Sequence, residues 1–131
     1  MSNLATVQSI YAAFGQGDVP KILASLSENV EWEYGGLSEV PWLAPRKGRS
    51  GAGEFFQSLA AIDIQRFQPK TFLESGNTVV VLIELEFIVK ATGRKVVEED
   101  ETHIWHFGPD GLVSRFRHRV DTYRHWAALK S

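Results

Sequence analysis

Titratable and aromatic side chains alternate along residues 96–121, and this stretch holds the best candidates for chemistry. We predict two strands, Val96–Phe107 and Leu112–Asp121, joined by a turn at residues 108–111. Side chains alternate between the two faces of a strand. One face would then gather Glu99, Glu101, His103, Trp105, Phe107, Phe116, His118 and Val120. A plain hydrophobic core needs no titratable groups, so this face predicts the wall of a pocket.

The two histidines on this face suggest proton transfer. His103 and His118 would be near neighbours on adjacent antiparallel strands, and the unperturbed pKa of a histidine, about 6.5, suits an acid or a base. Glu101 could orient them, and His118 is our best candidate for the proton-transfer group. Two alternatives stay open, which are ordinary buried histidines with satisfied hydrogen bonds and a metal site made of Glu101, His103 and His118. With no second ligand motif, we predict no metal and no cofactor.

The opposite face of the predicted sheet is strongly charged: Glu84, Glu86, Glu98, Asp100, Arg115, Arg117 and Arg119. Acidic strands beside a basic strand could form cross-strand ion pairs. A solvated surface is one interpretation. A symmetric dimer interface is the other, since a mixed-charge patch complements itself across a two-fold axis. We expect His125, near the end of the chain, to be exposed.

The elements that would position these residues follow from periodicity. Apolar residues spaced for a helix cover residues 3–15, Asp18 is a good cap for a second helix, and a third begins at Ser50. Strands are expected at Val30–Tyr34, Ile64–Glu74 and Thr78–Lys90, before the two named above, and a short helix at Thr122–Leu129. The connections between the later strands are short, so these should form an antiparallel meander. Helices followed by strands indicate the α+β class in one domain, residues 1–131.

One long loop interrupts this pattern, Gly35–Gly48. Long loops in small domains often serve function. Trp42 and Leu43 in its middle have no periodic partners, so we predict that the loop partly covers the pocket mouth with one of them dipping inward.

The composition of the chain narrows the possible classes of protein. The chain has 131 residues, 44% of them hydrophobic, a net charge of -2 and no cysteine. Disulfides and thiolate chemistry are excluded, and nothing favours nucleic acid. No apolar run approaches the ~20 residues that span a bilayer, and residues 1–4 have no signal-peptide profile. We expect a soluble, cytoplasmic protein.

The element order resembles the nuclear transport factor 2-like superfamily, and more narrowly its SnoaL-like members. The similarity rests on segments Tyr11–Asp18, Asn29–Trp32 and Asp110–Asp121. It implies a cone-shaped, cystatin-like α+β barrel with three N-terminal helices packed in the concave face of a curved, mostly antiparallel sheet. It also implies a pocket between helices and sheet, and a homodimer through the convex face.

The resemblance does not fix one activity. The oxyanion-hole tyrosine of ketosteroid isomerase corresponds to Tyr11, but its general base falls near Trp32 and its protonated aspartate near His103, so steroid isomerisation is disfavoured. Limonene epoxide hydrolase is poorly matched. Polyketide cyclases place an acidic aspartate where this chain has His118.

Together these arguments predict a small enzyme that uses acid–base catalysis, as an isomerase, cyclase or dehydratase, on a hydrophobic cyclic or carbonyl compound. The alternative is a non-catalytic binding domain for an apolar small molecule, and a dimeric interaction module is a more distant one. The catalytic candidates are His118, His103, Tyr11 and Glu101. The substrate-binding candidates are Phe14, Trp32, Tyr34, Trp42, Trp105, Phe116 and Val120.

Overall fold

A curved sheet wraps around the N-terminal helices in the computed structural model, which describes residues 2–33 and 37–130. The helices are α1 (Asn3–Gly15), α2 (Val19–Ala24), α3 (Gly48–Ser58) and α4 (Thr122–Lys130). The strands are β1 (Leu26–Glu33), β2 (Arg46–Lys47), β3 (Ile62–Ser75), β4 (Thr78–Val89), β5 (Lys95–Phe107) and β6 (Val113–Arg119). Short 3-10 turns lie at Pro41–Leu43 and Leu59–Ala61. The predicted α+β class is confirmed.

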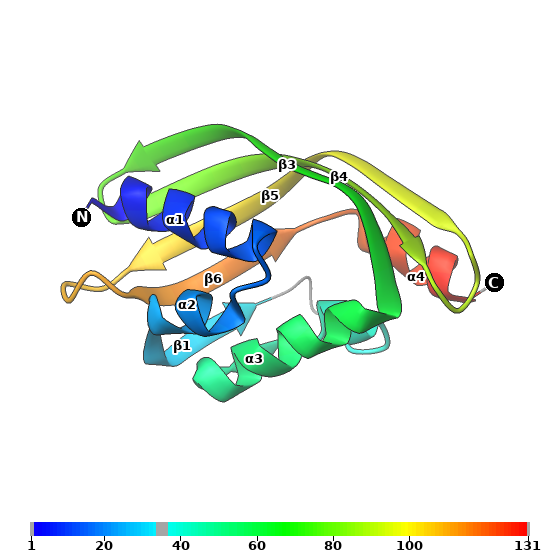
Figure 1. Cartoon of the computed structure of the whole chain (residues 1–131), viewed down its shortest axis with the longest axis horizontal. Helices are drawn as coiled ribbons and strands as arrows, with labels where there is room; N and C mark the ends of the chain where they lie inside the picture. Colours follow the sequence, from blue (N-terminus) through cyan, green and yellow to red (C-terminus); the bar gives the residue numbers. More distant parts are fainter. Residues whose placement is uncertain (1, 34–36, 131) are drawn as a thin grey trace.

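The sheet is mixed and does not close into a barrel. Its strand order is β2-β1-β6-β5-β4-β3, and β3 to β6 form the predicted antiparallel meander. β1 joins it by pairing parallel to β6. Figure 1 shows α1 beneath the arch of the sheet and α4 at the opposite end of the molecule from the N-terminus.

Local sequence signals explain where the first helices begin. The Ser2 hydroxyl accepts a hydrogen bond from the Ala5 N–H, 3.1 Å away, at the start of α1. The Asp18 carboxylate accepts one from the Lys21 N–H at 3.2 Å, so the predicted cap of α2 is confirmed. Both satisfy backbone donors that a helix start leaves without partners.

The long loop contains more structure than we predicted. It includes the turn Pro41–Leu43 and strand β2, and α3 starts at Gly48 instead of Ser50. Val40, Trp42 and Leu43 are all buried. This segment is therefore part of the hydrophobic core as well as a wall of the interior.

A bulge in β5 overturns part of the strand-parity prediction. Ile83 of β4 pairs with Glu101, whereas Leu85 pairs with Glu98, so β5 has one extra residue between these points. The extra residue reverses the alternation before Glu101. Glu99, predicted to face the pocket, is exposed, and Glu98, predicted on the charged face, turns inward with its side chain 9% exposed.

The charged face exists, but its ion pairs differ from those expected. Arg115 pairs with Glu33 and, at 3.6 Å, with Glu31, both on β1. The Arg119, Arg117 and Arg115 positions lie opposite Thr102, Ile104 and His106 of β5, none of which is acidic. The acidic residues Glu84 and Asp100 instead contact Lys70 of β3, at 3.7 and 2.9 Å. Strand register, which periodicity did not fix, decides these partners.

No helix in residues 2–33 or 37–130 combines the length and hydrophobicity that a bilayer crossing would need.

Candidate functional site

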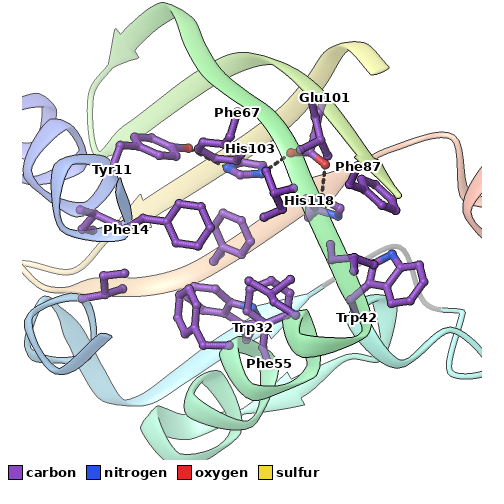
Figure 2. A pocket seen from close by; sticks show the side chains of 18 of the residues that line it. Tyr11, Phe14, Trp32, Trp42, Phe55, Phe67, Phe87, Glu101, His103 and His118 are labelled. Atoms are coloured by element: carbon purple, nitrogen blue, oxygen red, sulfur yellow. Dashed lines mark hydrogen bonds and ion pairs between the residues drawn. The ribbon is translucent and has the colours of Figure 1, made fainter. Parts of the chain in front are cut away.

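An aromatic cavity lies between the helices and the concave face of the sheet (Figure 2). Five of the predicted substrate-binding residues line it: Phe14, Trp32, Trp42, Trp105 and Phe116. Val120 does not. It packs, partly buried, against the core, because β6 ends at Arg119 and the chain then turns into α4. Tyr34 lies outside the described residues.

All four predicted catalytic residues meet at one wall of the cavity. The Tyr11 hydroxyl lies 2.7 Å from Nδ1 of His103. Nε2 of His103 lies 3.1 Å from one oxygen of Glu101, and Nε2 of His118 lies 2.8 Å from the other. Figure 2 shows the links from His103 through Glu101 to His118, with the Tyr11 hydroxyl beside His103.

Three elements, β5, β6 and α1, hold this hydrogen-bonded series in place. In the register of β5 and β6, His103 lies directly opposite His118 and Trp105 opposite Phe116, so the two imidazole centres are 5.2 Å apart. Tyr11 reaches the same point from α1, and its ring stacks on His103 with an interplanar angle of 17°. Trp105 fixes the hydroxyl by donating its indole N–H to it, at 3.0 Å.

Hydrogen-bond chemistry restricts where the protons are. An indole N–H can only donate, so the Tyr11 oxygen accepts from Trp105. When His103 is neutral and carries its proton on Nε2, it donates to Glu101, and its Nδ1 accepts the Tyr11 proton. When His103 carries a second proton, its Nδ1–H donates to the Tyr11 oxygen instead. The Tyr11 O–H is then released to face the cavity.

Burial and hydrogen bonds set the charges of the side chains in this hydrogen-bonded series. Burial raises the pKa of Tyr11 well above its usual range, with the Trp105 hydrogen bond opposing, so the phenol is neutral. Burial also opposes ionisation of Glu101, but the adjacent His118 and His103 imidazoles outweigh it and hold the pKa of this carboxyl well below its usual range. Burial lowers the pKa of His118, although Glu101 opposes the shift. This hydrogen-bonded series therefore holds an ionised Glu101 that accepts an N–H from each of the two imidazoles.

The same side chains resemble a metal-ligand set. Glu101, His103 and His118 each offer one ligand atom, and these atoms lie within 4.8 Å of one another. Two imidazoles and a carboxylate suit divalent transition metals. Here both Nε2 atoms are hydrogen-bonded to the carboxylate. That the protein uses no metal stays a sequence-based prediction.

The prediction that His125 is exposed is wrong. The residue is 1% exposed and lines the cavity, because α4 folds back against the open end of the sheet. Its Nδ1 accepts the Trp42 indole N–H at 2.9 Å, and its Nε2 contacts Glu98 at 2.8 Å. His125 and Ala128 are three residues apart in the predicted C-terminal helix, and this spacing is the sequence signal that could have placed both on one buried face.

Residues 7–116 match the family described as the SnoaL-like domain. The chain belongs to this family. No curated protein is similar enough in sequence to count as a match.

Solved structures resemble the SnoaL-like chain over nearly its whole length. An NTF2-like protein of unknown function from Burkholderia pseudomallei has 27% identity and a TM-score of 0.85, with all of both chains covered. An NTF2-like protein from Burkholderia xenovorans has 25% identity and a TM-score of 0.86, with 98% of this chain and 95% of that chain covered. TerC, co-crystallized with polyporic acid, has 25% identity and a TM-score of 0.81, with 98% of each chain covered.

Proposed function

We propose that this SnoaL-like protein is a small-molecule enzyme that uses acid–base catalysis on a hydrophobic cyclic or carbonyl compound, in an isomerisation, cyclisation or dehydration. One observation carries the proposal. Glu101, His103 and Tyr11 form a carboxylate–imidazole–hydroxyl series at the cavity wall, with contacts of 3.1 and 2.7 Å. This is the arrangement by which a catalytic triad lets a buried carboxylate orient an imidazole and stabilise it when it takes a proton.

The series can move a proton in both directions. With His103 neutral, the Tyr11 oxygen accepts a proton from the substrate while the phenol's own proton passes to Nδ1 of His103. The product of this step is a deprotonated substrate beside an imidazolium paired with Glu101. Tyr11 then donates to a second substrate atom as His103 returns its proton. One cycle relocates a proton and leaves the protein unchanged.

In this proposal Tyr11 contacts the substrate and His103 stores the proton. Glu101 supplies the charge that stabilises the stored proton. His118 donates its Nε2–H to the same carboxylate and so positions it. In this proposal the proton-transfer role that the sequence suggested for His118 belongs to the Tyr11–His103 pair instead.

The cavity limits the size of the ligand. Its volume is about 80 Å³, and one water needs roughly 10–15 Å³ on this scale. Space for roughly five to eight waters suits a compound of one or two rings among Phe14, Trp32, Trp105 and Phe116. The co-crystal of TerC with polyporic acid supports a small organic ligand.

A non-catalytic binding domain is the second candidate. It is favoured by the hydrogen bonds of four polar side chains of the cavity, since those described for Tyr11, His103, Trp105 and His125 all end on other protein side chains. Such a cavity could simply hold an apolar molecule.

A ligand screen with a matched variant separates the two candidates. Cyclic ketones, naphthols and aromatic acids are screened by thermal shift, and hits are followed for turnover in the wild type and in Tyr11→Phe. An enzyme should convert a hit, and Tyr11→Phe should bind the hit and not convert it. Binding without turnover of any hit in either protein would favour the binding domain, and the lack of any hit would contradict both.

We further propose a homodimer through the charged outer face of the sheet and a cytoplasmic location. The first is supported by the self-complementary pattern of acidic and basic side chains on that face. The balanced composition of the chain is compatible with the second.

A further inference from the structure

A second hydrogen-bonded series lies at the other end of the cavity, and the proton-transfer proposal does not use it. The Trp42 indole N–H donates to Nδ1 of His125 at 2.9 Å, and Nε2 of His125 contacts Glu98 at 2.8 Å. The three residues come from the turn Pro41–Leu43, from α4 and from β5. In Figure 2, Trp42 and Phe87 lie at the opposite end of the pocket from Tyr11.

The direction of every bond in this series is fixed. Because the indole N–H can only donate, Nδ1 of His125 must be the acceptor. The His125 proton then sits on Nε2 and is donated to Glu98. The second oxygen of Glu98 accepts the Asp121 backbone N–H at 2.9 Å, next to the start of α4. No nitrogen of His125 remains to take part in proton transfer.

Packing fixes the orientation of the indole as well. Trp42 meets Phe87 edge to face, with ring centres 5.8 Å apart, and His125 meets the same Phe87 at 5.2 Å. Trp42 is 3% exposed and His125 is 1% exposed. A large, rigid ring that is held by a hydrogen bond and by edge-to-face contacts has little freedom to move aside for a ligand.

We propose that Trp42 is the specificity-determining end wall of the cavity, and that His125 and Glu98 are positioning residues that hold its indole there. The inference rests on the proposed function in one respect, since it assumes that the cavity takes a ligand. The wall limits the ligand to about two fused rings measured from the Tyr11 end. A third ring would occupy the position of the indole.

The test compares two probes that share a hydroxyl and differ by one ring, 2-naphthol and 2-anthrol. Their affinities are measured by fluorescence titration with the wild type, Trp42→Ala, Trp42→Leu and Trp126→Ala. Trp126 is the matched control, because its indole N–H contacts a carboxylate, Glu39, at 3.3 Å, but the residue does not line the cavity. Trp42→Leu keeps the wall apolar and serves if Trp42→Ala fails to fold.

The wild type and Trp126→Ala should prefer 2-naphthol by at least about tenfold, a typical penalty for a group that a pocket does not accommodate. Both Trp42 variants should lose this preference through a gain in 2-anthrol affinity. If folded Trp42 variants still prefer 2-naphthol to the same extent, Trp42 is not the end wall that sets specificity. Failure of the wild type to bind any aromatic probe would overturn the proposed function and this inference with it.

A second pair of variants tests the positioning role. His125→Asn retains an acceptor near the position of Nδ1, whereas His125→Phe retains the ring and removes the acceptor. The Trp42 indole N–H should exchange slowly with solvent deuterium in the wild type and in His125→Asn, and at least about tenfold faster in His125→Phe. The preference for 2-naphthol should weaken in the same variant. Equal exchange in all three proteins would contradict a positioning role for His125.

Discussion

Glu101 decides the chemistry of this cavity because it is an ionised carboxylate that accepts one N–H from each of two imidazoles. A buried charge is tolerated only where hydrogen bonds or an opposite charge compensate it. Both compensations are available here, since either imidazole can take a proton and become the counter-ion. The same balance that stabilises the carboxylate in the resting protein therefore prepares His103 to accept a proton.

Removal of one hydroxyl should break the proton path without removing a ring. In Tyr11→Phe, the Trp105 N–H and Nδ1 of His103 lose their common partner, which should lower the free energy of unfolding by about 1–3 kcal/mol. Turnover of a substrate should fall by roughly 10²–10⁴. Urea unfolding and steady-state kinetics measure the two effects. Tyr123→Phe is the control, because Tyr123 is 70% exposed, and it should change neither quantity.

His118 should make stability depend on pH. Its pKa is lowered in the folded protein, so the unfolded chain binds the proton first once the pH falls below about 6.5. Stability that is present above that pH is then lost as the pH falls through the folded-state pKa, with a slope of up to about 1.4 kcal/mol per pH unit. Urea unfolding of the wild type and His118→Asn across this range tests the prediction. Equal slopes in both proteins would show that His118 does not contribute.

At the scale of elements, the bulge in β5 explains why the cavity has two polar ends. After the bulge, β5 presents Glu101, His103 and Trp105 to the cavity, and before it β5 presents Glu98 to His125. Without the extra residue, alternation would place Glu99 inside and Glu98 outside. The single extra residue thus decides that Glu98, and not Glu99, is the carboxylate that contacts His125 of α4.

Two isosteric substitutions one residue apart test this register. Glu98→Gln removes the charge from a carboxylate that accepts from His125 and from the Asp121 N–H, and it should cost about 1–3 kcal/mol. Glu99→Gln alters an exposed side chain and should change stability by no more than about 0.5 kcal/mol. Urea unfolding of the two variants side by side is the measurement. If Glu99→Gln loses more stability than Glu98→Gln, strict alternation holds along β5 and the strand has no bulge there.

Periodicity predicted the elements well and their exceptions poorly. The helix over residues 3–15 and the four long strands follow from spacing alone, and so does the meeting of His103 and His118. The bulge lies in the acidic run Glu98–Asp100, where no glycine or proline marks it. The parallel pairing of β1 with β6 and the return of α4 over the open end of the sheet depend on tertiary packing. That is why His125 and Glu98 were misplaced.

At the scale of the whole molecule, the outer face of the sheet carries an extended set of ion pairs that includes Lys95 with Glu86 at 2.8 Å and Arg66 with Glu84 at 2.7 Å. Exposed pairs of this kind contribute little to stability, typically 0–1 kcal/mol. Their pattern can instead specify how two copies meet, since charge complementarity acts mainly on specificity and association rate.

The proposed dimer should be visible in solution. Multi-angle light scattering at micromolar concentration should give twice the mass of one chain. Arg117→Glu with Arg119→Glu should shift the protein toward the monomer, because both changes place like charges on the outer face. Lys21→Glu with Lys90→Glu, at two exposed residues outside β6, makes the same change in net charge and is the control. A wild-type protein with the mass of one chain would contradict the proposed dimer.

The central claim is that the Tyr11–His103–Glu101 series transfers protons to and from a ligand in the cavity. Deuterium exchange into the acidic C–H positions of 2-tetralone, a two-ring ketone, measures this without knowledge of the natural substrate. NMR in D₂O should show exchange at least about 100-fold faster with the wild type than with Tyr11→Phe or Glu101→Gln, while Tyr123→Phe matches the wild type. Bound 2-tetralone that exchanges at the same rate in the wild type and Tyr11→Phe would contradict the claim.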